Sequence, residues 1–183
     1  DRLLVTLGVR RQSIETSDIS YQIVNGGKLS SAGGAVTSYD QSRTSPVAGI
    51  VFKAREDLSV YANYIEGLSP GESAPAQSGG QPVLNAGQSL RPYVSKQKEI
   101  GVKYDAGRIG GSLALFSTAK PRALVANGSF QAGGEDRHRG VELNVFGEAA
   151  KGLRVLGGVT WLDAKQKETG SLTTDGKRVI GVP

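Results

Sequence analysis

The sequence predicts an all-β fold, an antiparallel meander of about seven strands. Three observations support this prediction: apolar residues recur at every second position, the connections alternate regularly between short and long, and the composition is typical of β structure. The 183 residues include 26 Gly, and 38% are hydrophobic, with Val, Leu, Ile and Tyr concentrated in the alternating segments. These residue types favour strands over helices.

The alternation begins near residue 1, where Leu3, Val5, Leu7 and Val9 share one face of an extended segment. Such a period of two is typical of a strand with two unlike faces. The same pattern recurs in six further segments, at residues 45–54, 58–67, 95–104, 109–118, 137–147 and 153–164. Charged residues such as Glu99, Lys103 and Glu142 alternate with apolar ones, so one face of the sheet must be wet.

The connections between these segments alternate in length. Short turns follow the second, fourth and sixth segments, at residues 55–57, 105–108 and 148–152, whereas long connections rich in Gly, Ser, Pro and Gln follow the others. Short turns on one rim and long loops on the other are typical of an outer-membrane barrel, with short periplasmic turns and long extracellular loops. A soluble β-sandwich is the alternative, although its Greek-key crossings are less expected to give strict alternation.

Several other classes of protein are excluded. The apolar runs are short, as at residues 47–52, and a membrane-spanning helix needs about 20 residues. The chain has no Cys and one His, His138, so neither a metal site nor a catalytic triad can be assembled. We therefore expect no enzyme activity and no cofactor. The net charge of +5 is scattered rather than clustered, which argues against nucleic-acid binding.

One segment carries a specific family resemblance. Residues 95–105, SKQKEIGVKYD, are similar to a recurrent strand and turn in the barrels of TonB-dependent receptors for ferric siderophores. Further similar segments follow the family's order, at residues 45–53 (SPVAGIVFK), 58–64 (LSVYANY), 139–143 (RGVEL) and 176–183 (GKRVIGVP). The resemblance is weakest at residues 17–44 and 68–90, where the loops of the family also vary.

The resemblance implies a 22-stranded barrel in the bacterial outer membrane, closed around an N-terminal plug. It implies uptake of a ferric siderophore, driven by the TonB complex acting through the N-terminal region. We therefore expect residues 1–183 to be part of such a barrel, in contact with outer-membrane lipid, with the plug and the C-terminal strands lying outside this sequence. Haem, cobalamin or a sugar as cargo, and a soluble sheet that binds carbohydrate or mediates adhesion, remain alternatives.

Two sets of side chains follow from this expectation. Ferric chelates are bulky and often anionic, so aromatic and cationic residues of the loops are the candidate ligand contacts: Tyr39, Arg91, Tyr93, Phe130 and Arg137. Aromatic residues near strand ends are candidates for the interfacial girdles of a membrane barrel: Tyr61, Tyr64, Tyr104 and Trp161. The decisive test is whether the apolar residues of all the strands form one outward band on a single curved sheet.

Overall fold

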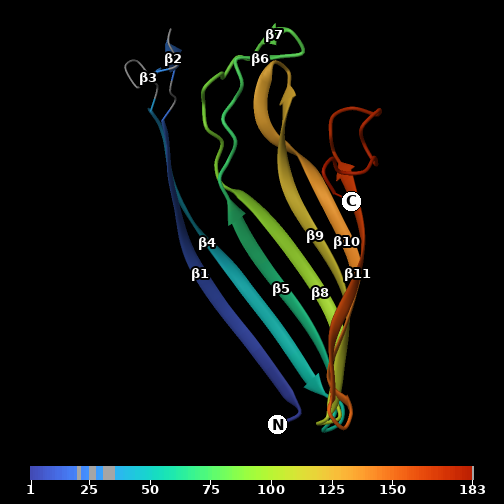
Figure 1. Cartoon of the computed structure of the whole chain (residues 1–183). Helices are drawn as coiled ribbons and strands as arrows, with labels where there is room; N and C mark the ends of the chain where they lie inside the picture. The colour runs from blue at the N-terminus through green and yellow to red at the C-terminus, as the bar shows by residue number, and fades with distance from the viewer. Residues whose placement is uncertain (20–21, 25–27, 31–35, 183) are drawn as a thin grey trace.

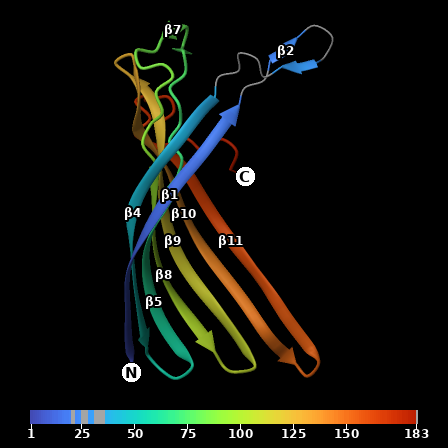
Figure 2. The same ribbon diagram turned by 90° about the vertical axis from the view of Figure 1, so that its left-hand side faces the viewer.

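The computed structural model describes the backbone of residues 1–19, 22–24, 28–30 and 36–182, and the side chains of residues 1–17 and 38–182. Seven long strands form one antiparallel sheet. They are β1 (Leu3–Ile19), β4 (Val36–Lys53), β5 (Leu58–Ser69), β8 (Tyr93–Asp105), β9 (Ile109–Ala126), β10 (Ser129–Ala150) and β11 (Leu153–Lys167). The strands are neighbours in chain order, so the sheet is a meander, and Figures 1 and 2 show that it is curved.

Two small ribbons complete the β structure of the described residues. β2 (Gln22–Val24) pairs with β3 (Lys28–Ser30), and β6 (Gln77–Ser78) pairs with β7 (Gln81–Pro82). Among the described residues there is no helix long and apolar enough to span a membrane. The prediction of an all-β meander of about seven strands is therefore confirmed.

The strands are longer than the sequence pattern indicated, and the prediction of one long loop was wrong. We expected a long loop after the fifth strand, but β9 runs on to Ala126 and β10 begins at Ser129. Asn127 and Gly128 form the turn between them, with φ angles of 51° and 77°. Asn-Gly suits a two-residue hairpin because both positions need a positive φ. Three long segments remain at this end. The connection between β1 and β4 contains β2 and β3, the connection between β5 and β8 contains β6 and β7, and the third segment follows β11.

The opposite end of the sheet carries the three short turns, as predicted. They connect β4 to β5, β8 to β9 and β10 to β11, and the N-terminus lies at the same end (Figure 1). In the turn after β8 the backbone N–H of Gly107 donates to the Asp105 carboxylate at 2.9 Å. Gly107 has a φ of 79°, a conformation that costs glycine little.

A small core lies at the end with the long connections. Ala74, Val83 and Phe130 are buried there, and Leu90, Ala123 and Val125 pack against them. Asn85 fixes this arrangement, because its side chain donates to the carbonyl of Phe130 at 2.9 Å and accepts from its N–H at 2.8 Å. The connection between β5 and β8 is thus folded against the β9–β10 hairpin.

Candidate functional site

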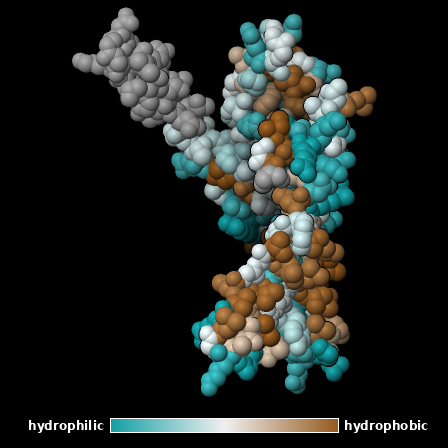
Figure 3. All heavy atoms as spheres, turned by 45° about the vertical axis from the view of Figure 1, so that its right-hand side comes forward, coloured by the Kyte–Doolittle hydropathy of each residue, from teal (hydrophilic) through white to brown (hydrophobic). Residues whose placement is uncertain are grey.

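The apolar residues of all seven strands form one band on one face of the sheet. The register aligns a row that contains Val5, Ile50, Ala62, Ile100, Leu115, Val141 and Trp161. The next row contains Leu3, Phe52, Val60, Val102, Leu113, Leu143 and Val159. Most of these side chains are exposed, and Trp161 has an exposed fraction of 62%. Figure 3 shows hydrophobic residues gathered over the lower half of the visible face.

The band crosses the register rows diagonally. On β1 its upper limit is Val9, four residues beyond Val5, whereas on β11 it is Trp161, which lies in the same row as Val5. Its lower limit shifts in the same direction, from Leu3 on β1 to Leu153 on β11. Strands of a membrane barrel are tilted by about 35–45°, so a band parallel to the membrane must cut across the rows. The apolar residues of the seven strands therefore form one outward band on a single curved sheet, as the membrane-barrel prediction required.

The opposite face carries a chain of polar side chains. The hydroxyl of Tyr61 on β5 donates to Glu99 on β8 at 2.7 Å, Gln97 donates to the same carboxylate at 3.3 Å, and Thr118 on β9 donates to Gln97 at 3.2 Å. The ammonium of Lys103 lies 4.9 Å from the centroid of the Tyr61 ring, a cation–π contact. Polar and charged side chains on this face suit the interior of a large barrel.

Three of the four aromatic residues predicted for an interfacial girdle lie on the apolar face. Tyr64 and Trp161 lie on the apolar face near the upper limit of the band, and Tyr104 lies on the same face near its lower limit. Tyr61 was placed wrongly, since it points to the polar face and is buried over β8. The odd and even positions of a strand point to opposite faces, and Tyr61 and Tyr64 differ in this parity.

A second polar cluster holds the connection after β11 against the sheet. Arg122 on β9 donates to the side chain of Gln166 on β11 at 2.6 Å and lies 3.4 Å from Asp136 on β10. The Gln166 amide donates in turn to the carbonyl of Arg178 at 3.0 Å, and its backbone N–H donates to the carbonyl of Lys177 at 2.8 Å. Gln166 is buried, so these partners satisfy a polar group that water cannot reach.

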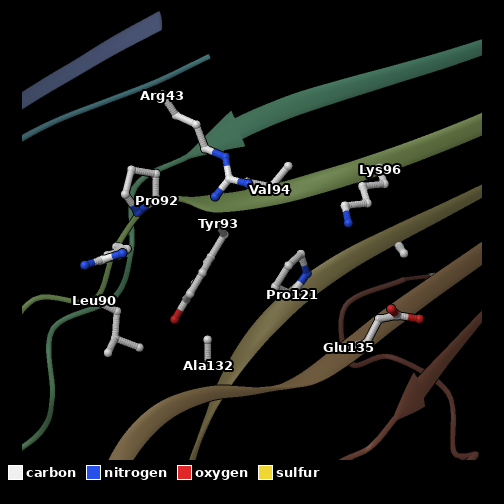
Figure 4. Close-up of a pocket in the computed structure, with 11 residues that line it drawn as sticks. Arg43, Leu90, Pro92, Tyr93, Val94, Lys96, Pro121, Ala132 and Glu135 are labelled. Atoms are coloured by element: carbon white, nitrogen blue, oxygen red, sulfur yellow. The ribbon is translucent and has the colours of Figure 1, made fainter. Parts of the chain in front are cut away.

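A pocket of about 470 Å³ lies at the end of the sheet that carries the long connections (Figure 4). Its lining contains three cationic side chains, Arg43, Arg91 and Lys96, together with Glu135 and the aromatic ring of Tyr93. Lys96 and Glu135 have the same strand parity as the apolar band, whereas Arg43 and Tyr93 have the opposite parity. The pocket, which lies above the band, is therefore lined by side chains of both faces.

Tyr93 is the most enclosed polar residue of this pocket. It is 6% exposed, and its hydroxyl has no hydrogen-bond partner of good geometry among the described residues. Burial, followed by the nearby charge of Glu72, raises the pKa of Tyr93 above its ordinary value of 10.0. The phenol is therefore protonated at neutral pH and can donate to an oxygen of a ligand.

The structure brings only two of the five candidate ligand contacts together. Arg91 and Tyr93 line the pocket. Phe130 belongs to the small core, and the hydroxyl of Tyr39 accepts a hydrogen bond from the N–H of Gly71 at 3.1 Å. Arg137 forms a salt bridge with Glu135 at 2.6 Å. A ligand role for each of the five stays a prediction.

Sequence reasoning missed three charged residues that line the pocket, Arg43, Lys96 and Glu135. Arg43 lies inside β4 and the other two lie inside β8 and β10, so a search confined to loops could not find them. For Lys96 and Glu135 the available signal was the alternation itself. Reading β8 upward, the outer face changes from Val102 and Ile100 to Lys98 and Lys96.

A single curved sheet with an apolar outer band and a polar inner face defines a segment of an outer-membrane β-barrel. The family model described as "TonB dependent receptor-like, beta-barrel" matches residues 1–183. The chain belongs to this family, whose members are receptors and transporters of the bacterial outer membrane.

Relatives of the chain are named as receptors. The chain is 44% identical to the ferrichrome receptor FcuA of Yersinia enterocolitica, over 100% of this chain and 23% of that protein. It is 28% identical to the metal-pseudopaline receptor CntO of Pseudomonas aeruginosa, over 97% of this chain and 24% of that protein. The chain thus spans about a quarter of the length of the relatives it matches.

Solved structures show the same fold. The ferric preacinetobactin receptor BauA of Acinetobacter baumannii superposes with a TM-score of 0.75 and 31% identity, covering 100% of this chain and 26% of that one. The ferric-catecholate import receptor Fiu of Escherichia coli K12 gives a TM-score of 0.74 at 22% identity, covering 96% of this chain and 27% of that one. The second likeness concerns the fold alone.

Proposed function

We propose that the protein containing this chain takes up a ferric siderophore across the outer membrane, with energy delivered by the TonB complex through its N-terminal region. The observation that carries the proposal is the two-faced wall, with an apolar band toward lipid and a continuous polar face from Tyr61 to Thr118 toward the barrel interior. The relatedness to a ferrichrome receptor over the whole chain supports the siderophore class. The protein acts as a transporter and carries out no catalysis.

The polar face suits transport because it presents side chains of both signs next to water. Glu99, Lys103 and Glu142 lie on this face, where charge costs little if the barrel interior is hydrated or filled by a polar domain. The extracellular end adds cationic side chains such as Arg91. Positive charge at an entrance raises the association rate of anionic ligands through steering.

The test is uptake of radioactively labelled cargo in a strain from which the full gene is deleted, with the label on the iron of each ferric siderophore and of haem, and on the cobalamin or the sugar itself. The strain is complemented with the full-length protein and grown under iron limitation, with a panel of ferric hydroxamate and catecholate siderophores, haem, cobalamin and a maltooligosaccharide. We expect complementation to restore uptake of iron from a siderophore, and deletion of TonB to abolish it. Restored uptake of haem, cobalamin or sugar alone would overturn the proposed cargo, and uptake without TonB would overturn the energy source.

A further inference from the structure

Strands β4 and β5 are paired along only part of their length. Their ladder ends at Val47 and Ile65, although both strands continue beyond these residues. Beyond this point, among the strands that the structure describes, β4 pairs with β1 alone and β5 pairs with β8 alone. Figure 1 shows β4 and β5 diverging toward the end that carries the long connections. We call the space between residues 38–46 and 66–69 the strand gap.

Pro46 explains why the ladder ends at this position. The N–H of Lys53 donates to the carbonyl of Arg2 at 2.8 Å, toward β1. Successive residues of a strand direct their backbone groups to opposite sides, so the even-numbered residues of β4 face β5. The next bonded pair of the ladder would join Pro46 and Glu66. Since proline has no N–H, the carbonyl of Glu66 finds no donor there and the two strands separate.

The strand gap leaves backbone groups without a partner strand among the described residues. On β4 they belong to Asp40, Ser42 and Thr44, which have the parity of Pro46 and are exposed. The gap begins where the apolar band ends, because Pro46 lies opposite Val9 in the register. Water can therefore solvate these groups, which hydrocarbon could not do. An open strand edge of this kind is the surface to which extended peptides add as a further strand.

Tyr39 indicates how wide the strand gap is at its open end. Its hydroxyl accepts a hydrogen bond from the N–H of Gly71 at 3.1 Å, so a side chain joins β4 to the segment after β5. A strand between two neighbours fills about 9.6 Å from one neighbour to the other, and a tyrosine side chain with its hydrogen bond spans a similar distance. The pocket lined by Arg43 and Tyr93 lies beside the gap (Figure 4). The open end therefore has room for one further strand.

The closed end of the strand gap is cationic. Four cationic side chains lie there: Arg10, Arg11, Arg43 and Lys96. Within the described part of the chain, none of them forms a salt bridge. Glu66, opposite Lys96, accepts a hydrogen bond from the Tyr64 hydroxyl at 2.6 Å. Further carboxylates lie toward the open end: Glu15, Asp40 and Glu72. Charge complementarity selects between partners, so the closed end favours an acidic one.

We propose that the strand gap binds an extended acidic peptide segment of a second protein, which pairs with the backbone of β4 at Ser42 and Thr44 as an added strand. Side chains of an added strand point alternately to the two faces of the sheet. Cations lie on both faces, with Arg43 on the inner face and Arg11 on the outer face. The site is independent of the cargo and requires only the gap between β4 and β5.

The test measures fluorescence anisotropy of labelled peptides with the full-length receptor in detergent. The probe is a peptide of about eight residues, within the usual range of strand lengths, with alternating Thr and Asp. One comparison peptide carries Lys in place of Asp, and another is the acidic peptide methylated at every backbone nitrogen, which leaves no N–H to donate. We expect only the unmodified acidic peptide to bind. No binding of this peptide would overturn the proposal. Equal binding of the Lys peptide would overturn the acidic partner, and equal binding of the methylated peptide would overturn the strand pairing.

Two variants test the position of the added strand. Ser42→Pro removes an N–H that faces the gap and leaves the bonds to β1 in place. Its matched control is Ser42→Ala, which keeps the N–H and removes the hydroxyl that Arg11 contacts at 3.4 Å. We expect Ser42→Pro to bind the acidic peptide at least about fivefold more weakly, as one lost backbone hydrogen bond implies, and the control to bind as the wild type does.

The second variant, Pro46→Ala, supplies the N–H that the carbonyl of Glu66 lacks. The ladder between β4 and β5 can then continue and narrow the gap, so we expect weaker binding of the acidic peptide here too. An unchanged affinity of folded Ser42→Pro would overturn the pairing along β4. An unchanged affinity of folded Pro46→Ala would overturn the role of Pro46 in holding the site open.

Discussion

The ring of Tyr61 on β5 covers Gly101 on β8 so closely that a Cβ at position 101 would lie 2.6 Å from it. The same ring places its hydroxyl on Glu99 at 2.7 Å. Aromatic side chains that cover glycines of a neighbouring strand are a known device for fixing the register and curvature of sheets. Phe146 covers Gly110 in the same way, so glycine and aromatic pairs recur on the inner face.

We therefore expect Gly101→Val to displace the Tyr61 ring and to break its hydrogen bond with Glu99. The cost should be about 1–3 kcal/mol of unfolding free energy, as for other overpacked sites. Urea unfolding of the full-length receptor in detergent micelles measures it. The control is Gly157→Val on β11, where nothing lies within 4 Å of the added Cβ. Equal costs at the two positions would show that the Tyr61 contact does not explain Gly101.

The apolar band predicts that the cost of a charged substitution depends on its depth in the membrane. Leu113 lies within the band on β9. Ser117 lies four residues further along the same face of β9, at the upper limit of the band. Arg on the lipid face of a barrel costs about 2–4 kcal/mol at the bilayer midplane and about 0–1 kcal/mol near the interface. We expect Leu113→Arg to destabilise the receptor refolded into lipid vesicles much more than Ser117→Arg does. Equal midpoints in a urea titration would contradict the placement of the membrane.

The contact between Arg122 and Gln166 predicts how the connection after β11 is held. Arg122→Ala leaves the buried Gln166 side chain without its 2.6 Å partner, which costs about 1–3 kcal/mol when the group stays buried. We expect faster cleavage by trypsin after Lys177 and Arg178, because the anchored segment opens more often. Lys120→Ala is the matched control, since it removes another cationic side chain on the same face of β9 and leaves the contact between Arg122 and Gln166 in place. Equal cleavage rates for both variants would count against the anchor.

The membrane-spanning part of the fold was predictable from the sequence because its signal is local. Each strand alternates between lipid and interior, and each short turn follows directly, as at Asp105 and Gly107. The extracellular extensions were not predictable in this way, since above Arg11 on β1 and above Arg137 on β10 both faces are largely polar. The Asn127-Gly128 turn was a local hairpin signal, but the Gly and Gln residues beside it favoured a loop.

The extracellular pocket could not be predicted for a different reason. It exists because the connection at residues 70–92 folds back onto β9 and β10, where Val83 meets Phe130 and Tyr93 lies near Ala132. Such contacts join residues more than thirty positions apart and leave no periodic trace in the sequence. The cations of the outer rim did leave a trace, because alternation alone assigns Lys96 and Lys98 to the face of Ile100.

The two outer strands, β1 and β11, predict the behaviour of the 183-residue chain in isolation. β1 pairs only with β4, and β11 pairs mainly with β10, although Lys165 also forms a bridge with Arg178. Open edges and a broad apolar face both promote association, and Leu7 on β1 is 79% exposed. We expect the isolated chain to form large assemblies in detergent-free buffer, as measured by size-exclusion chromatography with light scattering.

Two single substitutions separate the contribution of the edge from that of the apolar face. Leu7→Lys places a charge on an edge strand, where it opposes pairing with another copy. Ile100→Lys places the same charge on the same face of the central strand β8, where the backbone is already paired on both sides. We expect Leu7→Lys to reduce assembly more strongly. Equal reductions would assign the association to the apolar face alone, and a monodisperse wild-type monomer that melts cooperatively without detergent would contradict the membrane-barrel assignment itself.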